Sequence, residues 1–239
     1  MKLIAHRGGS FGKENSLETF IQAAKMGADA IECDIRRTKD GVLVIYHDES
    51  LGRLAGVDQK VSQTTFADMK MLLAKEGRQV LTFRELVEGY HEKTPILMHI
   101  KLLDFDPPFA KELVDSGLPL IAGVVSREML SCFARLLPPE KILAFMPDPS
   151  MAERYYAEGA GILRLWEQWL EEYTPAMIKE KCPNAEVFIM ACNLKRPVWE
   201  GIPLESMDGS AESLAMCEQL GADGVLLNNI QMALAWRDS

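Results

Sequence analysis

The fold is decided by the stretch from residue 27 to residue 47, which reads GADAIECDIRRTKDGVLVIYH. The apolar run from Ala30 to Ile35 predicts a buried strand. Asp40-Gly41 is a strong hairpin signal, so the run from Val42 to His47 is expected to return antiparallel to that strand. With a two-residue loop, Asp34 would lie opposite His47 on one face. A slip of one residue would move His47 to the other face.

Short apolar runs alternate with longer amphipathic segments along the rest of the chain, which is typical of parallel βαβ units. Helix starts are indicated at Asn15-Ser16-Leu17-Glu18, at the capping box Thr82 to Glu85 and at Pro107. Gly27, Gly159 and Gly221 are expected to end helices. The expected barrel strands number eight, as a TIM barrel requires: Lys2 to Ala5, Ala30 to Ile35, Ile96 to Lys101, Leu120 to Val125, Ile142 to Met146, Gly161 to Trp166, Val187 to Cys192 and Gly224 to Leu227.

The segment from Glu49 to Thr94 departs from this alternation. It holds polar loops and helices expected near Phe66 to Lys75 and Phe83 to Glu92, and we interpret it as an excursion that could cap the active-site face. At 239 residues, with no repeat or long linker, the chain fits one domain, residues 1–239. The predicted fold is therefore of the α/β class: a single TIM (β/α)8 barrel with a β-hairpin after the second strand and an excursion before the third.

Charge and composition narrow the function. The formal net charge of −9 argues against non-specific nucleic-acid binding, and no basic amphipathic stretch or long apolar span favours stable membrane insertion. The five cysteines are odd in number and widely spaced, which indicates reduced thiols. Together with the short apolar N-terminus, they predict a cytoplasmic protein. An acidic protein that binds an anion must concentrate positive charge locally.

Several polar residues end otherwise apolar strands, where TIM barrels carry their working groups. His6 and Arg7 follow the first strand, and His99 and Lys101 end the third. Glu32 and Asp34 lie two apart in the second strand, so they share a face about 6.6 Å apart. Two carboxylates in one pocket repel unless a cation joins them, and a divalent metal would do so. The alternatives are an exposed strand edge and ordinary ion pairs.

Five stretches of the chain resemble the ordered N-terminal motifs of glycerophosphodiester phosphodiesterases. They are His6-Arg7-Gly8, Glu14-Asn15-Ser16, the run from Gly27 to Asp34, Thr38-Lys39-Asp40-Gly41 and His47-Asp48. Weaker similarity continues through His99-Ile100-Lys101, Val125-Ser126, Asn193 and Gly221-Ala222-Asp223-Gly224. The resemblance therefore covers essentially the whole chain.

The resemblance implies a role for each matching residue. His6 and His47 match the paired acid/base histidines, Arg7 matches the arginine that holds the phosphoryl oxygens, and Lys101 matches the phosphate-facing lysine. Glu32 and Asp34 match two metal ligands. The implied reaction is hydrolysis of a glycerophosphodiester to glycerol 3-phosphate and an alcohol, with either water or the glycerol hydroxyl as nucleophile.

The chain departs from the family at its third metal ligand, because His99 stands where a glutamate is usual. One hypothesis keeps His99 as a ligand to a divalent ion (Mg, Ca, Mn or Zn), with imidazole favouring manganese or zinc. The other has protonated His99 replace the ion and pair with the acids, leaving a metal-free site. Further departures at Lys13, at Phe188 to Asn193, and at Leu227-Asn228-Asn229 indicate a divergent leaving-group pocket. Trp166, Trp169 and Trp199 could line it or simply pack, and Arg164 could reach phosphate or form an ion pair.

The favoured function is thus hydrolysis of a small-molecule phosphodiester, with no nucleic-acid partner. A lysophospholipid substrate would need an apolar groove at the barrel mouth. The non-catalytic alternative is a module that binds a phosphate ligand.

Overall fold

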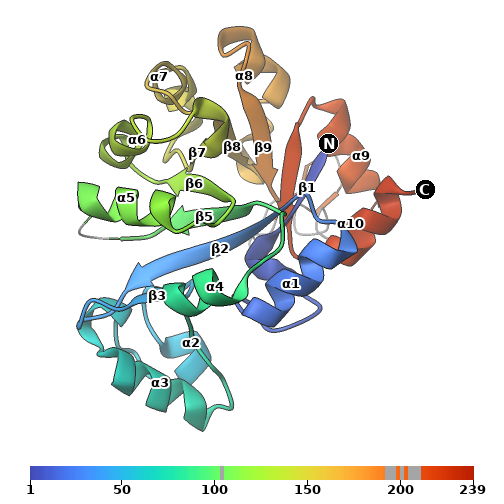
Figure 1. The fold of residues 1–239 in the computed structure, drawn as a ribbon. Helices are drawn as coiled ribbons and strands as arrows, with labels where there is room; N and C mark the ends of the chain where they lie inside the picture. The colour runs from blue at the N-terminus through green and yellow to red at the C-terminus, as the bar shows by residue number, and fades with distance from the viewer. Residues whose placement is uncertain (103–104, 192–197, 200–201, 204–210) are drawn as a thin grey trace.

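A computed structural model describes residues 1–102, 105–191, 198–199, 202–203 and 211–239. Eight parallel strands form its centre in the order β1-β12-β9-β8-β7-β6-β5-β2, and β1 also pairs with β2, which closes the barrel (Figure 1). The strands are β1 (Lys2–Ala5), β2 (Ala30–Arg37), β5 (Ile96–Ile100), β6 (Leu120–Val124), β7 (Ile142–Ala144), β8 (Ile162–Trp166), β9 (Glu186–Met190) and β12 (Gly224–Leu227). The predicted (β/α)8 fold is confirmed.

Two apolar clusters hold the barrel together. Side chains that alternate along the strands pack inside it, among them Ile4, Leu97, Leu143, Phe145 and Phe188. The opposite faces of the strands pack against the helices in a second, larger cluster. Parallel strands buried on both faces require nearly continuous apolar runs. For this reason the strands could be predicted from the sequence.

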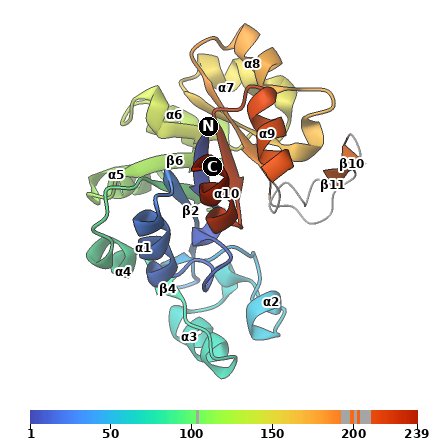
Figure 2. The same cartoon turned by 90° about the vertical axis from the view of Figure 1, so that its right-hand side faces the viewer.

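Helices surround the barrel (Figures 1 and 2). Where the caps were predicted, the structure has them: Ser16 accepts from the backbone of Thr19, Thr82 and Glu85 form the capping box, and Asp106 caps the helix that begins with Pro107. The helices are α1 (Leu17–Met26), α4 (Phe83–Gly89), α5 (Pro107–Asp115), α6 (Arg127–Phe133), α7 (Ala152–Ala157), α8 (Pro175–Lys181), α9 (Ala211–Gln219) and α10 (Ile230–Arg237). Single 3-10 turns are η1 (His6–Gly8), η2 (Val61–Gln63), η3 (Pro139–Lys141), η4 (Pro149–Met151) and η5 (Glu167–Trp169). Gly27, Gly159 and Gly221 have φ values of 99°, 112° and 83°, as helix-ending glycines do.

The hairpin after β2 exists, but its predicted register is wrong by one residue. Strand β3 (Leu43–Ile45) pairs Leu43 with Arg37 and Ile45 with Ile35, so Tyr46, not His47, lies opposite Asp34. The loop has three residues because Thr38 closes it: its hydroxyl accepts from the Val42 amide at 3.0 Å and donates to Asp40 at 2.6 Å. His47 lies beyond the end of β3, where the strict alternation of a strand no longer sets its direction.

The excursion forms a small layer beside the hairpin, at one side of the barrel (Figures 1 and 2). It contains α2 (Gly52–Ala55), α3 (Phe66–Lys75) and β4 (Leu81–Thr82), which pairs with β3. An apolar cluster that includes Val44 of β3, Leu51 and Met69 packs the excursion against the hairpin. Two further strands, β10 (Val198–Trp199) and β11 (Ile202–Pro203), pair antiparallel. Among the described residues, no helix is both long and apolar enough to span a bilayer.

Candidate active site

The barrel brings the seven predicted site residues to one mouth. Each lies within a strand or directly follows one: His6 and Arg7 lie in η1 directly after β1, Glu32 and Asp34 in β2, His47 after β3, His99 in β5, and Lys101 directly after β5. Because β1, β2 and β5 are parallel neighbours, their carboxyl ends meet at the same rim. Segments up to about a hundred residues apart in the sequence thereby share one site.

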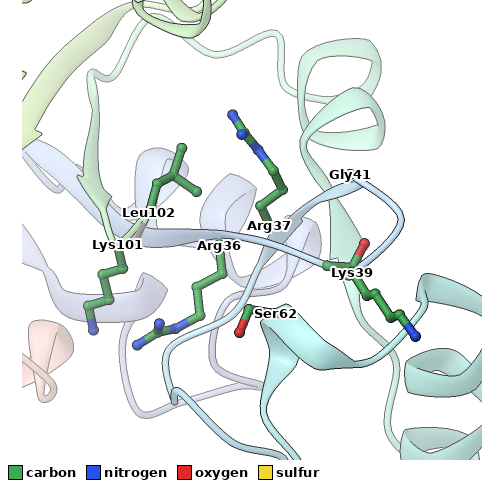
Figure 3. Close-up of a pocket in the computed structure, with 8 residues that line it drawn as sticks. Arg36, Arg37, Lys39, Gly41, Ser62, Lys101 and Leu102 are labelled. Atoms are coloured by element: carbon green, nitrogen blue, oxygen red, sulfur yellow. The ribbon is translucent and has the colours of Figure 1, made fainter. Parts of the chain in front are cut away.

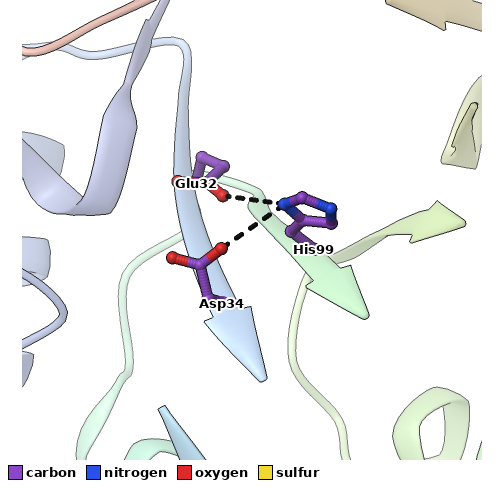
Figure 4. A group of neighbouring side chains, drawn as sticks. All are labelled: Glu32, Asp34 and His99. Carbon is purple, nitrogen blue, oxygen red and sulfur yellow. Dashed lines mark ion pairs between the residues drawn. The ribbon is translucent and has the colours of Figure 1, made fainter. Parts of the chain in front are cut away.

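Glu32, Asp34 and His99 form a compact cluster (Figure 4). Nδ1 of His99 lies 3.4 Å from Oδ1 of Asp34 and 3.8 Å from Oε1 of Glu32. Register explains the approach, since Asp34 and His99 are direct partners in the β2–β5 ladder. Both carboxylates are fully buried. Phe145 stacks on the imidazole of His99, with ring centroids 3.7 Å apart and planes 12° apart, and so fixes its orientation.

The two carboxylates differ in electrostatics. Burial, and then the charge of Asp34, raise the pKa of Glu32 to about 8. Burial also acts to raise the pKa of Asp34, but the hydrogen bond from His99 and the ammonium of Lys101, 2.8 Å away, outweigh it and hold that pKa well below its ordinary value. Burial lowers the pKa of His99 to about 4 despite its carboxylate neighbours. The cluster thus holds a neutral imidazole, one ionised carboxylate and one that gains a proton readily.

His6 is buried beneath the mouth and oriented by an amide. Its Nδ1 lies 2.8 Å from Oδ1 of Asn228. An amide oxygen only accepts hydrogen bonds, so Nδ1 donates and Nε2 keeps its lone pair, 3.9 Å from Oε2 of Glu32. Burial and the nearby charge of Arg7 lower the pKa of His6 to about 3. The result is a neutral imidazole whose free nitrogen faces the acidic cluster.

His47 is oriented by a carboxylate instead. Its Nδ1 lies 2.7 Å from Oδ1 of Asp48, and burial lowers its pKa although Asp34 and Asp48 act in the opposite direction. Its backbone carbonyl accepts from Nε of Arg36 at 3.0 Å and from Nζ of Lys101 at 3.3 Å. His47 therefore remains tied to the site despite the shifted hairpin register.

Arg7 occupies a strained backbone position. Its φ of 52° is unusual for a residue with a Cβ atom, and its amide donates to Oε2 of Glu32 at 3.0 Å. The guanidinium donates to Oε2 of Glu14 at 2.9 Å and lies 3.8 Å from Oδ2 of Asp34. The conformation directs the Arg7 side chain along the acidic pair. Such strain is typical of functional sites.

Several supporting residues were not assigned roles from the sequence. Arg53, in α2 of the excursion, lies 2.5 Å from Oε1 of Glu14 and 2.6 Å from Oδ2 of Asp48. Since Glu14 binds Arg7 and Asp48 binds His47, Arg53 links two halves of the site. Glu14 and Asp48 stood within recognisable motifs, but nothing in the sequence pointed to Arg53.

Asn15 is a second supporting residue. It is buried with a φ of 54°. Its side-chain amide donates to Oδ2 of Asp34 at 3.2 Å, and its side-chain oxygen accepts from the Asp34 backbone at 3.4 Å. It therefore positions the carboxylate from outside the barrel strands.

The aromatic candidates gather around Arg164. The guanidinium lies 4.3 Å from the ring centroid of Trp166 and 5.1 Å from that of Trp169, and it donates to the carbonyl of Met146 at 3.3 Å. Trp166 and Trp169 thus pack around a buried cation. The predicted strand end at Cys192, Asn193 and the side chain of Trp199 lie outside the described residues.

The acidic cluster fits a divalent metal. One donor atom each from Glu32, Asp34 and His99 lies within 4.8 Å of the others, and donors bound to one ion at up to about 2.4 Å lie at most about 4.8 Å apart. Oε1 of Glu32 is buried without a hydrogen-bond partner among the described residues, although buried polar atoms normally have one. A cation bound to the three donors would satisfy that atom.

The sequence of the chain is similar to those of known phosphodiesterases. The model of the glycerophosphoryl diester phosphodiesterase family matches residues 6–127. A glycerophosphodiester phosphodiesterase of Bacillus subtilis is 31% identical over 196 residues, 66% of this chain and 67% of that protein. One of Caldanaerobacter subterraneus is 36% identical over 124 residues, 51% and 48% of the two chains. Lysophospholipase D GDPD1 of Homo sapiens is 33% identical over 115 residues, which are 42% of this chain and 36% of that protein. The chain thus spans less than half the length of the latter two.

Solved structures share the fold. The glycerophosphodiester phosphodiesterase of Thermotoga maritima superposes with a TM-score of 0.70 at 22% identity, covering 98% of this chain and 96% of that one. A phosphodiesterase of Oleispira antarctica, solved with the product sn-glycerol-3-phosphate, superposes with a TM-score of 0.71 at 19% identity. The match covers 100% of this chain and 97% of that one. On the match of the family model and the B. subtilis relative, this chain belongs to the glycerophosphoryl diester phosphodiesterase family.

Proposed function

We propose that the chain hydrolyses glycerophosphodiesters to glycerol 3-phosphate and an alcohol, using His6 and His47 for general acid/base catalysis with the help of a divalent metal. The observation that carries the proposal is the convergence of two histidines, two cations and a three-donor cluster at one barrel mouth. Catalytic groups that meet in this way at the carboxyl ends of barrel strands are the basis of enzyme function in this fold. The relatives named as glycerophosphodiester phosphodiesterases support the same reaction.

In the proposed mechanism, His6 takes the proton of the nucleophile. Its Nε2 holds a lone pair because Nδ1 is engaged by Asn228, and its low pKa keeps it unprotonated at neutral pH. His47 gives a proton to the departing alkoxide. The carboxylate of Asp48 holds its Nδ1 and opposes the lowering of its pKa by burial, which helps the imidazole to carry the proton that a general acid must give.

Charge on the phosphoryl oxygens is stabilised by two side chains. Arg7 offers a planar set of donors suited to phosphate oxygens, and Lys101 offers an ammonium next to Asp34. Glu32, Asp34 and His99 would hold the metal, which when bound would neutralise further charge on those oxygens.

The low pKa of His99 supports its role as a metal ligand. A metal-free site with a protonated His99 requires the imidazole to be charged at neutral pH, whereas burial lowers its pKa to about 4. A neutral imidazole with two carboxylates suits manganese or zinc better than calcium. We therefore propose Mn²⁺ or Zn²⁺ as the working ion.

A release assay tests the proposal. Purified protein is given glycerophosphocholine, glycerophosphoethanolamine or lysophosphatidylcholine, with Mn²⁺, Zn²⁺, Mg²⁺ or EDTA, and glycerol 3-phosphate or lysophosphatidic acid is measured. We expect glycerol 3-phosphate from the first two with Mn²⁺ or Zn²⁺, and none with EDTA or in His6→Ala. Turnover of the lysolipid alone would favour the activity named in the human relative. Phosphodiester binding without turnover under all conditions would instead indicate a binding module. A cyclic phosphate intermediate, seen by ³¹P NMR, would identify the glycerol hydroxyl as nucleophile.

A further inference from the structure

A cationic pocket adjoins the catalytic residues. The cavity has a volume of about 150 Å³ and lies between the end of β2, the loop of the hairpin, η2 and the end of β5 (Figure 3). Four of the residues that line it are Arg36, Arg37, Lys39 and Lys101, and among the described residues none that lines it is acidic. Such a concentration of positive charge contrasts with the net charge of −9 of the chain. It forms a local attraction for an anion.

Arg36 connects this pocket to the catalytic residues. It lies two residues beyond Asp34 in β2, so both side chains project from the same face, about 6.6 Å apart along the strand. Figure 3 shows its guanidinium pointing to the same side as the Lys101 ammonium, and both groups donate to the carbonyl of His47. Arg37 points to the opposite side of the strand (Figure 3), where it lies over the ring of Phe109.

Arg36 has no carboxylate within ion-pair distance among the described residues. The carboxylates that influence it are Asp34, Glu49 and Asp48. Glu49 binds Lys60 at 2.6 Å, and Asp48 binds His47 and Arg53. Arg36 is itself partly buried, so its charge is partly removed from water while no carboxylate lies close enough to pair with it. A bound anion would provide that counter-ion.

We propose that this pocket binds a second anionic group of the substrate, a phosphate carried by the alcohol that is released. The inference rests on the proposed phosphodiesterase function. The glycerol part of a glycerophosphodiester carries only hydroxyls, so a second charge must belong to the alcohol part. Arg36 provides the planar donor pair that suits a phosphate, Ser62 provides a hydroxyl and Lys39 flanks the cavity. Preferred substrates are therefore glycerophosphodiesters whose alcohol is itself phosphorylated.

The experiment compares two diesters that differ in one group. Glycerophosphoglycerol and its derivative with a terminal phosphate are compared for kcat/KM with Mn²⁺, and for Kd by isothermal titration calorimetry in the absence of turnover. We expect the wild type to favour the phosphorylated diester by about tenfold or more, the contribution of one charge-assisted hydrogen bond. Arg36→Gln should bring this ratio close to one, and Arg36→Lys should retain part of it. Arg84→Gln removes the same charge from the exposed face of α4, outside this pocket, and should leave the ratio unchanged.

The possible outcomes test the pocket assignment and the proposed phosphodiesterase function separately. Turnover of both diesters with a ratio near one, or an equal loss of the ratio in Arg84→Gln, would overturn the pocket assignment and leave the phosphodiesterase function intact. Absence of turnover with a tenfold difference in Kd that depends on Arg36 would overturn the function and retain the pocket. Stimulation of glycerophosphoglycerol turnover by millimolar inorganic phosphate would show an effector site instead, and would also overturn the substrate proposal.

Discussion

At the scale of single residues, the proposed chemistry depends on how two histidines are held. His6 has an amide partner and is deeply buried, whereas His47 has a carboxylate partner and is partly exposed. An amide fixes a tautomer without favouring charge, and a carboxylate also favours the imidazolium. The two environments therefore separate the pKa values of the pair in the way that a base and an acid require.

Asp48→Asn should shift the pH dependence of turnover toward lower pH. The hydrogen bond from Asp48 raises the pKa of His47 against burial, so its loss lowers that pKa and the protonated fraction at neutral pH falls. We expect kcat at pH 7 to drop about tenfold, with the alkaline limb of the kcat profile moving to lower pH. If the alkaline limb of the kcat profile stayed at the same pH in Asp48→Asn, His47 would not be the general acid.

His99→Ala should weaken metal binding, and His99→Glu should preserve it. Alanine removes one of three donors, for which we expect an affinity loss of at least about tenfold, measured by calorimetry with Mn²⁺. Glutamate restores a three-carboxylate set and should shift preference from Mn²⁺ toward Mg²⁺. If the wild type bound no metal and His99→Glu did, the metal-free alternative would be correct.

That these seven residues meet at one mouth was predictable, because they lie in or directly after neighbouring strands that the barrel brings together. Their partners were less predictable. Asp48 and Glu14 stood next to predicted residues, but Asn228 and Phe145 come from segments far along the chain. The sequence pattern does not predict that Phe145 stacks on His99, because this contact depends on the relative register of the barrel strands.

At the scale of elements, the excursion stabilises the site from outside the barrel. Its helix α2 supplies Arg53, which binds Glu14 and Asp48 together. The sequence predicted α3 and α4 and left the position of the excursion open. Its placement follows from β4, which extends the hairpin sheet.

Arg53→Met should reduce activity with little loss of stability. The side chain is half exposed, and exposed ion pairs contribute at most about 1 kcal/mol. Freed from Arg53, Glu14 and Asp48 would hold Arg7 and His47 less firmly, so we expect kcat/KM to fall several-fold. Lys60→Met removes an exposed ion pair with Glu49 in the same excursion and should leave kcat/KM unchanged. Equal effects of the two substitutions would exclude a positioning role for Arg53.

Gly123→Ala should disturb the support of His99. A Cβ atom there would lie 2.6 Å from the Phe145 ring and 2.8 Å from the carbonyl of Met98. Such overpacking typically costs about 1–3 kcal/mol, measured as the free energy of unfolding in urea, and should also weaken Mn²⁺ binding. Gly52→Ala, where the added Cβ contacts only the Ser50 hydroxyl at 3.4 Å, is the matched control. A fully stable Gly123→Ala variant with normal Mn²⁺ affinity would contradict the packing argument.

The hairpin shows the limit of sequence at this scale. Asp40-Gly41 correctly indicated a turn. The loop has three residues, not two, because the hydroxyl of Thr38 accepts from the Val42 amide across the loop. Two- and three-residue loops both suit this sequence. The pairing register is therefore shifted by one residue. If β3 had continued to His47, this shift would have turned the His47 side chain to the face opposite the site.

At the scale of the whole molecule, closure of the barrel is what assembles the site. The pairing of β1 with β2 and of β2 with β5 places three strand ends side by side. The eight strands were predictable because each is an apolar run buried on both faces. The closed order then followed from right-handed βαβ connections.

Metal should stabilise the molecule increasingly as pH rises from 7 to 8.5. The pKa of Glu32 is raised to about 8, so in this range the unfolded chain has lost a proton that the metal-free fold retains. Stability of the metal-free protein therefore falls as pH rises. The depressed pKa values of His6 and His99 do not contribute, because these histidines are neutral in both states above pH 7. Since a ligand carboxylate must be ionised, the rise in Tm caused by Mn²⁺ should grow with pH. A constant rise would contradict this assignment.

The most direct test of the metal-assisted account is an anomalous difference map from crystals of the wild type grown with Mn²⁺. We predict one strong peak within about 2.0–2.4 Å of Glu32, Asp34 and His99, absent from crystals of His99→Ala. A map with no peak at these three residues, from protein that hydrolyses glycerophosphodiesters equally well in EDTA, would contradict it.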